Sequence, residues 1–283
     1  MELEGTKNMI TTITTAALCL SMLGTTQERL PKETIPAYEV DALDYALLDV
    51  EDENRDKVGL PMRFAIPTQV SITPASHGIW ERLENGQFRW TFRITCDNSL
   101  SLNLGFGRYT MPSSGTMVIM NRDIDCQIRP FTSEDNKDHG ELWTPIIPSN
   151  SATIEIVVDA VDKREVSKTV ELTSINAGYW AFKSGENRGG SGSCNIDVLC
   201  SQGDSWWNEI PSVGVYTLNG YLTCTGAMIN NTAQDGTPYF LTANHCGVTS
   251  SSDSSIVVYW NHQNSYCRAP GSGDSGGNGN GSF

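Results

Sequence analysis

The order of apolar and polar residues predicts one helix early in the chain and strands over most of the remainder. Residues 41–57 carry apolar side chains at near-helical intervals among acidic ones, at Leu43, Leu47, Leu48 and Val50. A stripe with this period is typical of a helix that lies with one face on a core. The pattern therefore predicts a helix over Asp41–Lys57.

From Arg63 to Phe182 the pattern changes to that of strands. Phe88–Ile94 alternates apolar and polar residues with a period of two, as a half-buried strand does. Met117–Met120 and Ile154–Val158 are short apolar runs typical of buried strands. Turn-forming residues such as those at 84–86 separate the runs. We therefore expect one all-β domain of the sandwich type in this region.

The last third of the chain begins after a polar, glycine-rich linker, Ser184–Gly192. Four apolar segments beyond it are typical of strands: Gly214–Leu218, Tyr221–Ile229, Tyr239–Ala243 and Ile256–Trp260. The final segment, Ala269–Phe283, consists almost entirely of small and polar residues. Because it has almost nothing to bury, we expect a loop or a disordered tail there.

The start of the chain has the features of a secretory signal peptide. Lys7 precedes an apolar, threonine-rich stretch over Met9–Gly24, and we assign residues 1–27 to the signal. A buried N-terminal helix is the alternative. No run of 18 or more apolar residues occurs, so a membrane is not expected as a partner. The predicted location is secreted, either extracellular or periplasmic.

Charge excludes one class of partner and indicates a boundary. The net charge is -14, and an acidic surface repels the phosphate backbone, so no nucleic-acid partner is expected. From Gly189 onward there are six acidic residues and a single basic one, Arg268. This break in composition places a domain boundary near Arg188. We therefore divide the mature sequence into residues 28–188 and residues 189–283.

The cysteines indicate disulfides rather than a metal centre. Five of the eight lie between Cys194 and Cys267, and no CxxC pair occurs. Zinc ribbons and thioredoxin-type sites use that pair, whereas exported proteins commonly use scattered cysteines for disulfides. No metal and no cofactor are therefore predicted. Whether Cys96 and Cys126 pair with each other is left open by the sequence.

The segment with the clearest chemistry is Tyr239–Gly247, in which an apolar strand leads directly to His245. Cys246 follows the histidine, and Cys224 stands 22 residues upstream. A bridge between these cysteines would close a hairpin and fix the backbone of the histidine. A catalytic base needs such fixing, because its nitrogen must reach the nucleophile by a hydrogen bond.

The segment Leu241–Cys246 resembles the histidine signature of chymotrypsin-type serine proteases, and more closely that of bacterial lysyl endopeptidases. The similarity continues through three further segments of the last third: Gly192–Cys200, Cys224–Thr232 and Ile256–Pro270. Four upstream segments resemble the propeptide of the same family: Arg63–Pro67, Ser101–Phe106, Arg129–Phe131 and His139–Pro145. The resemblance covers roughly residues 35–270.

The resemblance implies an all-β protein: a sandwich-like propeptide domain at 28–188, then the first, incomplete barrel of a chymotrypsin-like double β-barrel at 189–283. It implies that His245 is the general base and that the propeptide packs on its own catalytic domain. It also implies the disulfides Cys200–Cys267 and Cys224–Cys246, with Cys194 paired farther downstream. The expected substrate is a protein or peptide, cut after lysine.

The sequence around Ser275, Gly273–Gly277, repeats the letters of the nucleophile motif of that clan. Ser275 follows His245 by only 30 residues, however, and lies in a tail without strands. A catalytic nucleophile must be held in a fixed position, and a tail without strands cannot hold it. We therefore interpret the motif as low-complexity sequence. Asp253 is interpreted as a hydrophilic loop residue. We therefore expect the catalytic aspartate and serine to be absent from these 283 residues, which would be inactive alone.

Two functions remain in competition at this stage. The first is the precursor of a secreted serine endopeptidase that cuts after lysine. The absence of lysine after Gly189 supports it, because such a composition resists self-digestion. Self-processing would then occur after Lys183 or Arg188. The second is a secreted, non-catalytic β-rich protein derived from a protease, acting as an inhibitor or binding module.

Overall fold

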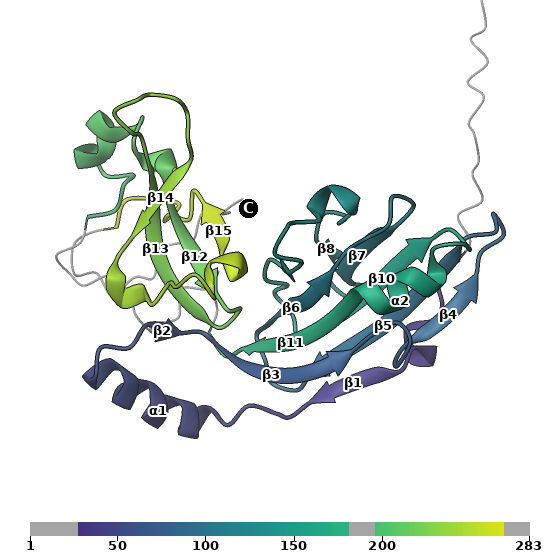
Figure 1. Cartoon of the computed structure of the whole chain (residues 1–283). Helices are drawn as coiled ribbons and strands as arrows, with labels where there is room; N and C mark the ends of the chain where they lie inside the picture. The colour runs from purple at the N-terminus through teal and green to yellow at the C-terminus, as the bar shows by residue number, and fades with distance from the viewer. Residues whose placement is uncertain (1–27, 181–195, 269–283) are drawn as a thin grey trace, which may run out of the picture.

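The computed structural model describes residues 28–180 and 196–268, which fold mainly into β-strands with a few short helices (Figure 1). The predicted all-β class is thereby confirmed. The predictions for the signal peptide at 1–27, the linker Ser184–Gly192, Cys194 and the tail with Ser275 lie outside the described residues. None of the helices in the described ranges is long and apolar enough to cross a membrane.

Residues 28–180 form a sandwich of two β-sheets, called the sandwich below. One sheet has six strands in the order β1-β5-β10-β7-β8, with β4 beside β1 on the edge of β5. Its strands are β1 (Ala37–Val40), β4 (Ile79–Arg82), β5 (Phe88–Cys96), β7 (Thr116–Asn121), β8 (Cys126–Gln127) and β10 (Ser151–Val158).

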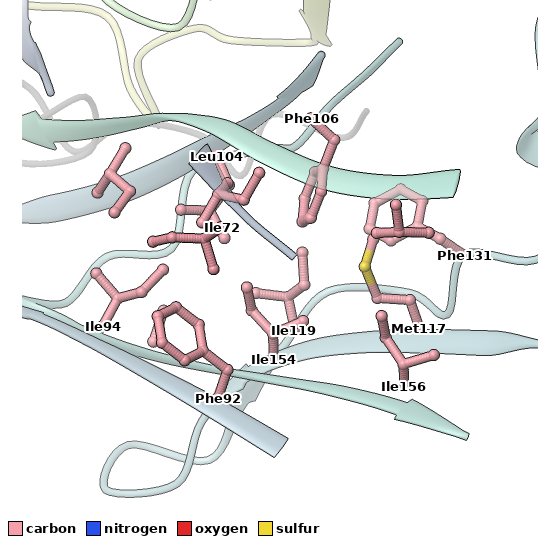
Figure 2. Close-up of a cluster of buried hydrophobic side chains, with 14 of the residues drawn as sticks. Ile72, Phe92, Ile94, Leu104, Phe106, Met117, Ile119, Phe131, Ile154 and Ile156 are labelled. Carbon is pink, nitrogen blue, oxygen red and sulfur yellow. The ribbon is translucent and has the colours of Figure 1, made fainter. Parts of the chain in front are cut away.

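The other sheet of the sandwich has four strands in the order β3-β11-β6-β9. These are β3 (Ala65–Ile72), β6 (Ser101–Tyr109), β9 (Leu142–Trp143) and β11 (Val170–Gly178). Side chains from both sheets meet in one core, where Phe92 and Ile154 face Leu104 and Phe106 (Figure 2). These side chains are at most 1% exposed, because alternate residues of each strand point inward.

Two helices accompany the sandwich. The first, α1 (Tyr45–Lys57), begins four residues later than Asp41, because the Asp44 side chain accepts a hydrogen bond from the Leu47 backbone and caps the helix there. The expected apolar face is also wrong in part: Leu48 is buried, but Leu47 is 54% exposed. The second, α2 (Lys163–Thr169), was not predicted, because two turns are too short for a recognisable period.

Residues 213–260 form a separate sheet, called the C-terminal sheet below. Its antiparallel order is β14-β13-β12-β15. The strands are β12 (Val213–Leu218), β13 (Leu222–Ile229), β14 (Tyr239–Thr242) and β15 (Val257–Trp260), close to the predicted segments. Tyr216, Leu218 and Cys246 form its small core. The sheet agrees with the expected part of a chymotrypsin-like barrel.

A short strand from the chain segment just before β3 belongs to the C-terminal sheet. Strand β2 (Met62–Arg63) lies just before β3 in the chain, and it pairs with Leu222 and Thr223 at the start of β13. In Figure 1, β2 lies beneath the C-terminal sheet and continues towards the sandwich. The two β-regions are therefore in direct contact.

Trp206 and Trp207 lie before the C-terminal sheet, at the end of a 3-10 helix over Ser201–Trp206. Tryptophan side chains are largely buried on average. Among the described residues, however, these two side chains are 58% and 50% exposed.

The structure answers the open question about Cys96 and Cys126. Cys96 ends β5 and Cys126 begins β8, and β10 and β7 lie between these strands. Three strand spacings amount to about 14 Å, whereas bridged cysteines have Cα atoms within about 7 Å. Both cysteines are free thiols in the structure.

We therefore predict that denatured, unreduced protein will yield alkylated Cys96 and Cys126 peptides in mass spectrometry. In the native protein Cys126 should react much faster, because Cys96 is fully buried and burial raises the pKa of its thiol. Cys126→Ser should remove the fast reaction and leave Cys96 protected. A disulfide-linked peptide containing both residues would contradict the fold.

Candidate active site

His245 lies in a tight turn at the end of β14. The turn is a 3-10 helix over Asn244–Cys246, which begins directly after the strand and Ala243. The Cys246 backbone N–H donates to the Ala243 carbonyl at 3.1 Å, which closes the turn. Gly247 ends it with a φ of 73°, a conformation that glycine adopts without strain. The backbone of His245 is thus held, while its side chain is exposed.

A disulfide connects this turn to the neighbouring strand. Cys246 is bonded to Cys224 of β13, with 6.0 Å between the Cα atoms. Closing a loop of this length restricts the unfolded chain and contributes about 3 kcal/mol to stability in the chain-entropy model. Cys246 is 2% exposed and packs beside Tyr216 and Leu218. The residue after the histidine is therefore fixed by a covalent bond and by the core.

Thr242 fixes the chain on the other side of the histidine. Its hydroxyl donates to the carbonyl of Thr225 at 2.8 Å, across the pair of strands. The hydroxyl of buried Tyr216 lies 2.9 Å from the same oxygen, and it donates because the Thr242 proton is already used. Together with the disulfide, these bonds hold both sides of the histidine turn in place.

The histidine ring lies close to the disulfide. One nitrogen of His245 and the sulfur atoms of Cys224 and Cys246 lie within 4.8 Å of one another. Two cysteines and a histidine at this spacing could hold a zinc ion if both sulfurs were thiolates. The sulfurs are bonded to each other, however, so they lack the charge that a metal ligand needs. The group is a structural clamp for the histidine.

A shallow hollow of about 460 Å³ lies beside the end of β14. Its lining is mostly apolar and comes from β12, β13 and β14: Val213, Thr225, Gly226, Ala227, Leu241, Thr242 and Ala243. Leu241 is 60% exposed, and β14 is an edge strand of the sheet. An edge strand offers backbone groups to an extended peptide. The hollow could thus receive a peptide close to the histidine turn.

Asp253 and His139 make local hydrogen bonds of their own. Asp253 is exposed and accepts a hydrogen bond from the Ser254 backbone, as expected of a loop residue. His139 accepts a hydrogen bond from the Glu141 backbone at 3.1 Å, so it makes a local turn contact in the sandwich. Within residues 28–180 and 196–268, the side chain of His245 makes no hydrogen bond. The described part of the chain therefore holds the candidate base without a nucleophile beside it.

An ion pair that sequence reasoning missed ties the beginning of the C-terminal region to its end. Asp197 accepts hydrogen bonds from the backbone and the guanidinium of Arg268, each at 2.8–2.9 Å. The pair stands next to the Cys200–Cys267 disulfide, whose Cα atoms are 4.7 Å apart. The Asp197 side chain is only 10% exposed. The available signal was that Arg268 is the only basic residue after Gly189.

Hydrogen bonds from Arg268 lower the pKa of the Asp197 carboxyl to about 2. A lowered pKa contributes stability above the unfolded value of about 3.9, and this contribution disappears as the pH falls towards 2. We predict that Asp197→Ala will lower the free energy of unfolding by about 2 kcal/mol at pH 7. The difference from the parent should shrink between pH 4 and pH 2.

Urea unfolding at a series of pH values, followed by tryptophan fluorescence, measures this difference. Asp253→Ala is the control, because that carboxylate is exposed and bonds only within its own turn. Its effect should stay below about 0.5 kcal/mol. A loss for Asp197→Ala that is equally large at pH 2 would show that packing, and not charge, is responsible.

Comparison with known proteins first indicates the class of protein to which the C-terminal region is similar. Residues 188–281 match a protein-family model described as "Lysyl endopeptidase, C-terminal domain". The match covers the histidine turn and both disulfides of the described C-terminal region. It supports a relationship to serine endopeptidases, the class that the sequence resembles.

A comparison with an individual protein is more specific than the family model. The chain is 22% identical over 226 residues to the lysyl endopeptidase of Pseudomonas aeruginosa, and the alignment covers 75% of this chain and 47% of that protein. The chain thus spans about half the length of the curated relative it matches. Because the alignment is longer than the C-terminal region, the similarity extends into the sandwich. Both comparisons support the lysyl endopeptidase family.

Proposed function

We propose that this chain contributes the propeptide and the histidine-bearing part of a secreted serine endopeptidase that cuts after lysine. Residues 1–27 would direct export, residues 28–188 would form the propeptide, and residues 189–283 would open the protease domain. The observation that carries the proposal is the position of His245. It lies on a turn that is fixed on both sides, with its side chain exposed.

In this proposal His245 is the general base. It takes the proton of a serine hydroxyl while the serine oxygen bonds to the carbonyl carbon of the substrate. It then gives that proton to the leaving amine as the peptide bond breaks, and water releases the acyl group in a second, equivalent step. The serine, and the aspartate that orients the histidine, come from outside the described residues. The fixed turn supplies the geometry that proton transfer requires.

The composition of the C-terminal region supports a specificity for basic residues. Residues 189–283 contain no lysine and one arginine. That arginine, Arg268, is held by Asp197 through its backbone and its guanidinium, next to a disulfide. A protease cuts a segment that is extended and accessible. The peptide bond on the carboxyl side of Arg268 is therefore protected from self-digestion. The preference for lysine over arginine follows the family model and the relative named above.

The position of the sandwich supports its role as a propeptide. Strand β2 pairs with the start of β13, next to Cys224, which carries the disulfide to the histidine turn. Pro61 lies beside the turn, since a Cβ atom on Gly247 would be 3.7 Å from its Cγ atom. The sandwich therefore touches the turn that holds the base. Removal of the propeptide would release this contact.

The test is expression of the complete reading frame that contains these residues, with hydrolysis of a lysyl amide as the readout. We predict that His245→Ala will lower kcat about 10⁴- to 10⁶-fold, because the serine loses its base. The thermal unfolding midpoint should change little, since the side chain is exposed.

The control variant is His262→Ala, which changes a histidine of the same region at a position that the proposal does not use. Its activity should remain within a few-fold of the parent. Equal activity of His245→Ala and the parent would overturn the assignment of the base. If the parent protein hydrolyses neither lysyl nor arginyl amides, the proposed enzymatic function is overturned. The alternative function, a non-catalytic binding protein, is then favoured.

A further inference from the structure

The outer face of the four-stranded sheet of the sandwich is polar but buried. Four small polar residues point outward from its central strands: Ser101 and Asn103 of β6, and Ser174 and Asn176 of β11. They are 4%, 2%, 2% and 0% exposed, respectively. The outer face of a sandwich normally meets water. Here the hairpin between β12 and β13 reaches this face at Gly220.

The two asparagines form an oriented pair. Asn103 and Asn176 are directly opposite each other in the register of β6 and β11. The Asn176 amide nitrogen donates to the Asn103 side-chain oxygen at 3.0 Å, and the Asn176 oxygen accepts from Ser174 at 3.0 Å. These bonds fix both amide groups. The Asn103 amide nitrogen is thereby aimed outward, where it donates to the Gly220 carbonyl at 2.8 Å.

The hairpin presents a turn that matches this pair. Asn219 and Gly220 both have positive φ, at 53° and 73°, as in a type I′ turn. A Cβ atom on Gly220 would lie 2.3 Å from the Asn176 amide nitrogen and 2.6 Å from the Asn103 oxygen. No side chain fits at those distances. The asparagine pair therefore binds the carbonyl of the turn and leaves no room for a side chain at this position.

A second set of bonds fixes the chain immediately after the turn. The Phe64 backbone N–H donates to the Tyr221 carbonyl at 2.9 Å, while its own carbonyl accepts from Tyr179 at 3.1 Å within the sandwich. Strand β2 continues this contact along β13. Phe64 is fully buried at the junction. The turn and the strand that follows it are thus held at adjacent positions by the sandwich and by the segment that leads into β3.

We propose that this face is a recognition site for an Asn-Gly hairpin turn, with the Asn103–Asn176 pair as its specificity-determining element. Its partner is the β12–β13 hairpin of the C-terminal sheet. The site keeps the two parts together after the chain between them is cut. This rests on the proposed function in one respect only, namely that the chain between the sandwich and the C-terminal region is cut.

The experiment uses the full 283-residue chain with the recognition sequence of a site-specific protease inserted between residues 188 and 189. After folding and cleavage, size-exclusion chromatography and dilution followed by tryptophan fluorescence measure the Kd of the two parts. We expect the parent parts to elute together. Gly220→Ala should raise the Kd at least tenfold, because the new methyl group collides with both asparagines.

Gly236→Ala is the matched control. Gly236 has a similar φ of 75°, and nothing lies within 4 Å of the position where its Cβ atom would be. Gly236→Ala therefore introduces similar backbone strain but no collision with the sandwich. The Kd between the two parts of this variant should stay within about twofold of the parent value. Asn103→Ala changes the sandwich alone, so it tests the same contact with the hairpin unaltered. It should raise the Kd about fivefold or more.

A double variant, Gly220→Ala with Asn176→Ala, tests the collision directly. Removing the Asn176 amide makes room for the methyl group, so the double variant should bind more tightly than the two single effects predict. Parent-like Kd values for both Gly220→Ala and Asn103→Ala would overturn the proposal, as would separate elution of the parent parts. None of these measurements depends on catalysis. An inactive enzyme with tight, Gly220-dependent association would refute the proposed function alone.

Discussion

Strand β13 has backbone groups on two edges, and the need to pair both determines how the C-terminal region is built. Strand β12 pairs along one edge, whereas β14 covers only Gly226–Ile229 on the other. The uncovered stretch at Leu222 and Thr223 is where β2 of the sandwich binds. Unpaired buried backbone groups cost free energy, so this addition stabilises the sheet. It does so beside Cys224, from which the histidine turn is fixed.

Features carried by neighbouring residues were predictable from the sequence. The strand before His245 and the adjacent cysteine stand within one short segment, and the period of two in Phe88–Ile94 predicts the strand β5, although Arg89 and Thr91 on its polar side are buried as well. The contact between Asn103 and Gly220 could not be predicted, because the residues are 117 positions apart and neither belongs to a periodic pattern. A buried asparagine has no sequence signal that separates it from an exposed one. Tertiary packing alone decides whether an asparagine is buried.

The early helix shows a different limit. Its apolar stripe is genuine, but the helix buries only Leu48 and leaves Leu47 in solvent. Instead, two acidic residues of α1, Glu51 and Asp52, bind Arg63 of β2 at 2.9 Å. The helix is thus attached largely through charge to the strand that joins the two β-regions. A hydrophobic period gives no information about such an attachment.

In the proposed function the sandwich must later leave the C-terminal sheet, and the chemistry of the contact between the two β-regions suits such a partner. Its described bonds are mainly hydrogen bonds of amides, backbone groups and hydroxyls, such as that between the Ile146 N–H and the Tyr259 hydroxyl. Each contributes about 1 kcal/mol net, because water competes for both partners. Geometry then supplies specificity, because the turn at Gly220 has no room for a side chain. In the proposed function, a sandwich held by such bonds binds its own hairpin selectively and can still dissociate.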